Sequence, residues 1–108
     1  MLAPIVIDEH GDVSFYPDVA LAARALEPID ALNNEYVAYD SLAYTLQLVP
    51  GNQRVTIAGR TSETPKPEEL NSALRSFYER ASGESVPSSV ESLQELLALC
   101  IKRFGYDA

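Results

Sequence analysis

The 108-residue chain is acidic, with a formal net charge of −8. Its 46% hydrophobic residues are too many for a disordered chain, and a chain of this length can bury a core without disulfides or metals. No apolar run approaches the roughly 20 residues needed to cross a bilayer, and the first residues lack the basic segment of a signal peptide. These features predict a single domain over residues 1–108, in the cytoplasm and not in a membrane.

The first segment predicts a β-hairpin. Residues 4–8 are mostly β-branched, and residues 13–16 alternate apolar and polar side chains, as strands do. Gly11 lies between them and accommodates the positive φ of a tight turn. Carboxylates and one imidazole flank this turn, but a lone histidine among the acids of a polar hairpin tip does not predict a metal site.

A short helix follows over residues 17–27. Pro17 and Asp18 are favourable at a helix start, and the apolar positions recur at helical spacing. Pro28 lacks the N–H group that would continue the helix, so we expect the helix to end before it. Asn33 and Asn34 then supply turn chemistry. Residues 26–40 therefore form a corner between a helix and a sheet, against which the rest of the chain packs.

Three strands are predicted next, over residues 35–40, 44–49 and 54–59. Turn signals separate them at residues 40–43 and 50–52, which favours an antiparallel meander. The expected core-facing side chains are Tyr44, Leu46, Leu48, Val55 and Ile57. Residues 35–40 carry large side chains on both faces. They predict an inner strand, covered by helices on one face, with aromatic residues exposed or covered by a partner on the other.

Two helices close the chain after a connection at residues 60–67. An apolar stripe from Leu70 to Ala81 predicts the first helix, and Gly83 ends it. Ser88 with Glu91 forms a capping-box pattern for the second, whose wide apolar face includes Cys100, expected to be a small core residue. The predicted fold is α+β: an antiparallel sheet of about five strands (hairpin, helix, three-stranded meander) packed by two C-terminal helices.

The charge is unevenly distributed along the chain. Residues 1–53 carry eight acidic residues against one basic residue, Arg24, whereas residues 54–108 carry eight acidic and seven basic residues. A negative field repels the phosphate backbone of nucleic acids and attracts basic partners. The first half therefore favours a basic protein partner over a nucleic acid, unless its acidic surface serves only solubility.

The sequence contains few residues arranged as catalytic groups. His10 is the only histidine, and its place in a turn suits neither an oriented general base nor the activation of a nucleophile. Asp8 and Asp12 form a carboxylate pair at a hairpin tip that is too wet to raise a pKa for acid–base work. The chain has no glycine-rich phosphate loop or dinucleotide fingerprint. The sequence predicts no enzyme, no cofactor, no catalytic residues and no metal ligands.

A family resemblance rests on three runs of residues. Leu26-Glu27-Pro28-Ile29-Asp30, then Asn34-Glu35-Tyr36-Val37-Ala38-Tyr39-Asp40, then Leu46-Gln47-Leu48 together resemble a pattern found in small bacterial immunity proteins. The resemblance covers residues 5–59 and departs after Asp40, where Leu42 and Ala43 replace the usual acidic residue and glycine. It implies a protein encoded beside a polymorphic or contact-dependent toxin, which it neutralises by binding. Such toxins are often basic nucleases or other enzymes that act in the cytoplasm.

Charge and resemblance together predict an immunity protein that occludes a basic cognate toxin. The expected partner-binding residues are acids and tyrosines of the first hairpin, the strand start and the second hairpin, because aromatic side chains anchor interfaces while charges steer them. They are Asp8, Glu9, Asp12, Glu35, Tyr36, Tyr39, Asp40, Leu42 and Tyr44. The alternative is a non-catalytic structural or regulatory adaptor that forms a homodimer through its C-terminal helices.

Overall fold

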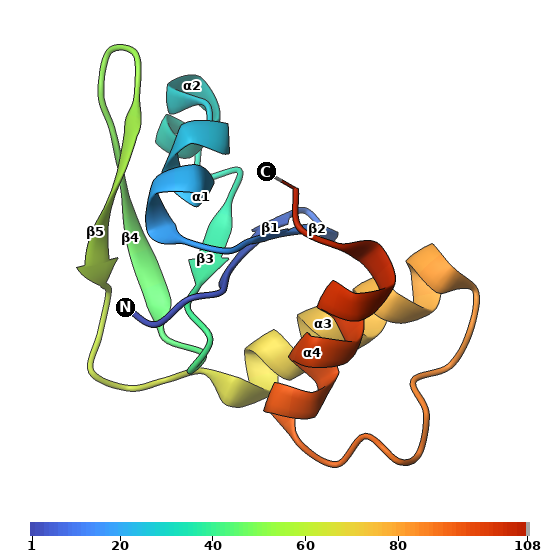
Figure 1. Cartoon of the computed structure of the whole chain (residues 1–108). Helices are drawn as coiled ribbons and strands as arrows, with labels where there is room; N and C mark the ends of the chain where they lie inside the picture. The colour runs from blue at the N-terminus through green and yellow to red at the C-terminus, as the bar shows by residue number, and fades with distance from the viewer. Residues whose placement is uncertain (108) are drawn as a thin grey trace.

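The computed structural model describes residues 1–107 and contains one five-stranded antiparallel sheet (Figure 1). The strands lie in the order β2-β1-β3-β4-β5. The sheet thus joins the predicted hairpin to the predicted meander, through pairing of β1 with β3, and the α+β fold is confirmed. The strands are β1 (Ile5–Glu9), β2 (Asp12–Tyr16), β3 (Val37–Tyr39), β4 (Thr45–Pro50) and β5 (Val55–Arg60).

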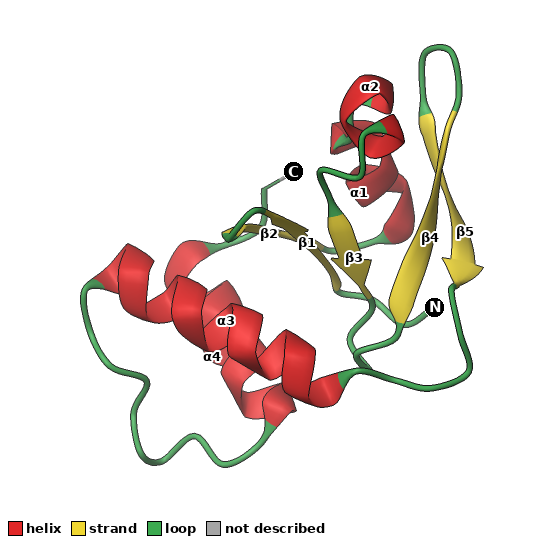
Figure 2. Ribbon diagram, turned by 180° about the vertical axis from the view of Figure 1, so that it is seen from behind, coloured by secondary structure: helices red, strands yellow, loops and turns green. Residues whose placement is uncertain are grey.

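Helices cover both faces of the sheet. Figures 1 and 2 show α1 and α2 on one face and the α3–α4 pair on the other. Alternation along β1 supplies both cores, since Ile5 and Ile7 face α1 and α2 while Val6 faces α3 and α4. The described helices are α1 (Val19–Ala25), α2 (Pro28–Leu32), α3 (Pro67–Ser82) and α4 (Leu93–Phe104).

The two C-terminal helices pack on β1, β2 and β3. Leu70, Leu74 and Tyr78 of α3 are buried, at the spacing that the apolar stripe predicts. Leu96, Leu97 and Cys100 of α4 meet them in the same cluster, and Gly83 ends α3 at φ 72°. No residue of β4 or β5 belongs to this cluster, so the face of β4 and β5 turned away from α1 and α2 lies outside it.

The corner after α1 differs from the prediction. Asp18 caps α1 as expected, accepting a hydrogen bond from the Leu21 N–H at 2.8 Å, and the helix ends before Pro28. However, Pro28 also starts α2, because proline has a φ suited to the first helical turn and needs no donor there. Ala31 of α2 is buried in the core that α1 shares with β1, β3, β4 and β5. The expected turn is therefore preceded by a second short helix.

The start of α4 is also different. Ser92, not Ser88, is the N-cap, and its Oγ accepts a hydrogen bond from the Glu95 N–H at 3.1 Å. Both serines precede a glutamate by three residues, so the capping pattern alone does not choose between them. Val86 and Val90 pack against the core from the connecting loop, and this anchoring delays the helix until residue 93.

One outer edge of the sheet is closed by the chain itself. The Asp107 N–H donates to the Phe15 carbonyl of β2 at 2.8 Å, and the Asp107 Oδ2 accepts from the Phe15 N–H at 2.9 Å. Residue 107 thus pairs with β2 on the side opposite β1. A strand edge without such a cover is a template for pairing with another chain.

Candidate protein-binding surface

The turn between β1 and β2 presents carboxylates at one end of the sheet. The Asp8 Oδ1 accepts a hydrogen bond from the Gly11 N–H at 2.8 Å, which holds the turn in shape. Glu9 lies directly opposite Asp12 in the pairing register. Like charges in this arrangement destabilise a hairpin, so these two acids are not explained by the stability of the hairpin.

The residues just before β3 lie beside this turn. The His10 Nε2 contacts a carboxylate oxygen of Glu35, and this carboxylate raises the pKa of His10 above its ordinary value of 6.5. The Tyr36 hydroxyl donates to the Asp30 Oδ2 at 3.4 Å and accepts from the Glu27 N–H at 3.2 Å. Burial raises the Tyr36 pKa, and the neighbouring carboxylates add to this shift. Tyr36 therefore connects the strand start to α2.

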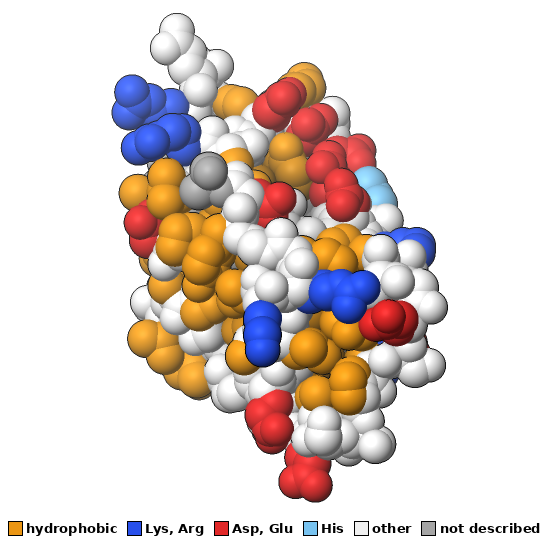
Figure 3. All heavy atoms as spheres, turned by 45° about the vertical axis from the view of Figure 1, so that its right-hand side comes forward, with side chains coloured by type: hydrophobic (Ala, Val, Ile, Leu, Met, Phe, Trp, Pro, Cys, Tyr) orange, Lys and Arg blue, Asp and Glu red, His pale blue; other side chains and the backbone are white. Residues whose placement is uncertain are grey.

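The contribution of α2 to this surface was not predicted from the sequence. Ile29 and Leu32 on this helix are 61% and 63% exposed, and Val37 at the start of β3 is 41% exposed. A proline at the first helical position followed by apolar residues three apart was the available signal. We name these three side chains, together with Asp8, Glu9, Asp12, Asp30 and Glu35, the acidic end. Figure 3 shows acidic side chains gathered near the pale-blue histidine.

Two of the predicted contact residues are buried. Tyr39 is 2% exposed, and its hydroxyl donates to the Glu69 Oε1 of α3 at 2.5 Å. Burial and this carboxylate together raise the Tyr39 pKa. Asp40 is fully buried, and its Oδ1 accepts from the Leu42 and Tyr44 N–H groups at 3.0 Å each. The inner face of β3 is covered by the protein's own helices, so both side chains belong to the interior.

The remaining two predicted residues lie away from the acidic end. β3 runs antiparallel to β1, so the turn after β3 lies at the opposite end of the strand. Leu42 in that turn is 46% exposed, and the Tyr44 ring lies under the Arg60 guanidinium, 3.6 Å from ring centroid to Cζ. Ala43 between them has a φ of 68°, in the left-handed region that favours glycine. The predicted contact set is thus divided between two ends of the sheet and the core.

Residues 1–107 hold few groups suited to metal binding or catalysis. Within this range, no three His, Cys, Asp or Glu side chains are grouped as a metal site. Cys100 is fully buried, and this burial raises the pKa of its thiol to about 11. The thiol is therefore protonated at neutral pH and inert as a nucleophile.

No protein-family model, curated protein or solved structure matches this chain. None of the four described helices has both the length and the apolar character needed to cross a membrane. The acidic end, with its carboxylates and exposed apolar side chains, is the surface feature with the clearest functional meaning.

Proposed function

We propose that this protein is a bacterial immunity protein that acts in the cytoplasm and binds a basic cognate toxin through the acidic end. The observation that carries the proposal is the combination of clustered carboxylates with three exposed apolar side chains: Ile29, Leu32 and Val37. Apolar side chains supply interface area, while charges speed association and select the partner. The resemblance of residues 5–59 to immunity proteins supports the same function.

Inhibition by occlusion follows from this composition. A basic enzyme that acts on an acidic substrate carries positive charge around its active site. The acidic end would cover that surface and exclude the substrate, with no chemistry required of the inhibitor. The like-charged pair Glu9 and Asp12 supports a role in binding, because a positive partner surface would offset the repulsion that the pair adds to the hairpin.

The adaptor alternative has less support in the packing. A homodimer through the C-terminal helices needs an apolar face of α4 free to meet a second copy. Leu96, Leu97 and Cys100 of that face are already buried against α3 and the sheet. A concentration-independent monomer in sedimentation velocity is therefore the expected state of the protein alone.

The proposal is tested by co-expression with the product of the adjacent gene. We expect rescue of growth and a one-to-one complex that weakens with salt, because exposed charges are screened. Glu9→Lys with Asp12→Lys keeps a like-charged pair across the hairpin but reverses its sign, and should weaken the complex at least about tenfold.

The matched control is Glu63→Lys with Glu91→Lys. Both residues are exposed and lie outside the acidic end, and the net charge changes equally. Equal weakening by the two double variants would reduce the effect to overall charge and contradict the proposed surface. The absence of both toxicity and complex formation would contradict the function itself.

A further inference from the structure

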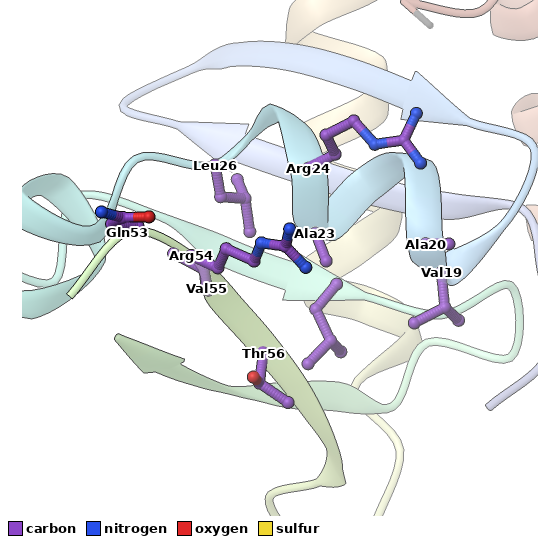
Figure 4. Close-up of a pocket in the computed structure, with 10 residues that line it drawn as sticks. Val19, Ala20, Ala23, Arg24, Leu26, Gln53, Arg54, Val55 and Thr56 are labelled. Atoms are coloured by element: carbon purple, nitrogen blue, oxygen red, sulfur yellow. The ribbon is translucent and has the colours of Figure 1, made fainter. Parts of the chain in front are cut away.

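A groove runs between α1 and β5 on the face opposite α3 and α4. Its volume is about 630 Å³, and Val19, Ala23 and Leu26 form its helical wall. The other wall is formed by residues 53–57, five consecutive positions (Figure 4). Successive side chains of a strand point to opposite faces of a sheet, so consecutive residues line one groove only where that groove follows the strand's edge.

The backbone of β5 has hydrogen-bonding groups free along this edge. The Gly51 N–H donates to the Arg54 carbonyl at 2.7 Å, which makes this a hydrogen-bonded pair of the hairpin. Pairs alternate along an antiparallel ladder, so Val55 opposite Pro50, and Ile57 opposite Leu48, are non-hydrogen-bonded pairs. Their N–H and C=O groups therefore point away from β4 and into the groove.

The two outer edges of the sheet differ in whether another part of the chain is hydrogen-bonded to them. Asp107 covers the edge of β2 with a pair of backbone-directed hydrogen bonds. Within residues 1–107, no backbone segment is hydrogen-bonded to β5 on its outer side. The uncovered edge is short, because Gly59 at φ 132° departs from the extended conformation near the end of β5.

The charges beside the groove determine which segment fits it. Arg24 and Arg54 both line the groove, and in the described part of the chain neither forms an ion pair. Figure 4 shows Arg54, which directly precedes β5, extending toward α1. Antiparallel pairing of two β5 strands about Ile57 would place Arg54 opposite Arg60, which disfavours a second copy of the protein in that register.

We propose that this β5 groove binds an extended, acidic segment of another protein, which adds to the sheet as a sixth strand. Backbone groups of Val55 and Ile57 would pair with the segment. Apolar side chains at the centre of the segment would rest against α1, and acidic side chains nearer its ends would meet Arg24 and Arg54. This inference does not depend on the proposed function, which uses the opposite charge at a different surface.

The test uses a capped valine–glutamate peptide of about six residues, the usual length of a strand. Its valines lie at the centre and its glutamates at both ends. We expect it to shift the amide resonances of β5 in two-dimensional NMR and to slow hydrogen exchange at Val55 and Ile57. A valine–lysine peptide should not bind. A valine–glutamate peptide with N-methylated backbone on its pairing side should lose binding, since it keeps the charges but cannot form the ladder.

Variants separate the groove from general charge effects. Arg24→Gln with Arg54→Gln should weaken peptide binding about tenfold, whereas Arg75→Gln with Lys102→Gln, both exposed and outside the groove, should leave it unchanged. Glu9→Lys with Asp12→Lys should also leave peptide binding intact, which keeps this test distinct from that of the proposed function. Equal binding of the N-methylated peptide, equal loss in the control variant, self-association through β5, or no binding at millimolar peptide would each overturn the proposal.

Discussion

Asp40 organises the turn between β3 and β4 through a single carboxylate. Its Oδ1 holds the Leu42 and Tyr44 N–H groups, and its Oδ2 accepts from the Leu2 N–H at 3.3 Å. The side chain thus fixes both the turn and the segment that precedes β1. A buried carboxylate is tolerated here because backbone donors replace its water.

Replacing this carboxylate should destabilise the protein. We expect Asp40→Ala to lower the free energy of unfolding by about 2–4 kcal/mol, because the backbone N–H groups of Leu2, Leu42 and Tyr44 lose their acceptor in a partly buried site. Asp40→Asn keeps one acceptor oxygen and should cost about 1 kcal/mol. Urea denaturation measures both, with Leu42→Ala in the same turn as a control within about 0.5 kcal/mol of wild type. An unchanged midpoint for Asp40→Ala would contradict this role.

His10 and Glu35 form a pH-dependent contact at the acidic end. The carboxylate raises the folded-state pKa of His10 above 6.5. The contribution to stability is therefore fully present below pH 6.5 and is lost as the pH rises through the folded-state value. An NMR titration of the imidazole should give a midpoint above 6.5, and Glu35→Gln should lower that midpoint. Identical midpoints in the two proteins would show that the contact does not persist in solution.

At the scale of elements, the start of α4 distinguishes two serines with the same local sequence pattern. Ser92→Ala removes the N-cap acceptor and should lower the free energy of unfolding by about 1 kcal/mol. Ser88→Ala is the matched control, exposed and outside the helix, and should change it by less than about 0.5 kcal/mol. Chemical denaturation measures both, and the reverse order would place the helix start at the earlier serine.

Local sequence patterns predicted the helices and strands better than the residues at which the helices begin and end. The alternation of residues 54–59 placed Val55 and Ile57 inward, and the stripe from Leu70 to Tyr78 identified the buried face of α3. Pro28 was ambiguous because proline both ends one helix and begins the next. The choice of Ser92 over Ser88 depends on contacts of Val86 and Val90 with residues distant in the sequence, which no local pattern contains.

At the scale of the whole molecule, the site was predictable only in part. The sequence pattern predicted that the hairpin and the meander share one sheet, but not the order of the strands. The pairing of β1 with β3 brings Glu35 and Tyr36 to the first turn. The sequence pattern did not predict that helices cover both faces of the sheet, and that covering places Tyr39 and Asp40 in the interior. Large side chains on both faces of a strand indicate that both faces are covered. They do not indicate whether the covering residues belong to the same chain or to a partner.

The closure of β2 by Asp107 also has a consequence for synthesis on the ribosome. Phe15 and Asp107 are 92 positions apart, so the first hairpin emerges with an open outer edge long before the residue that covers it. Throughout that interval the nascent chain exposes strand backbone to its neighbours on the polysome. The acidic residues at the tip of that hairpin place like charges on identical chains, and like charges oppose edge-to-edge pairing between them.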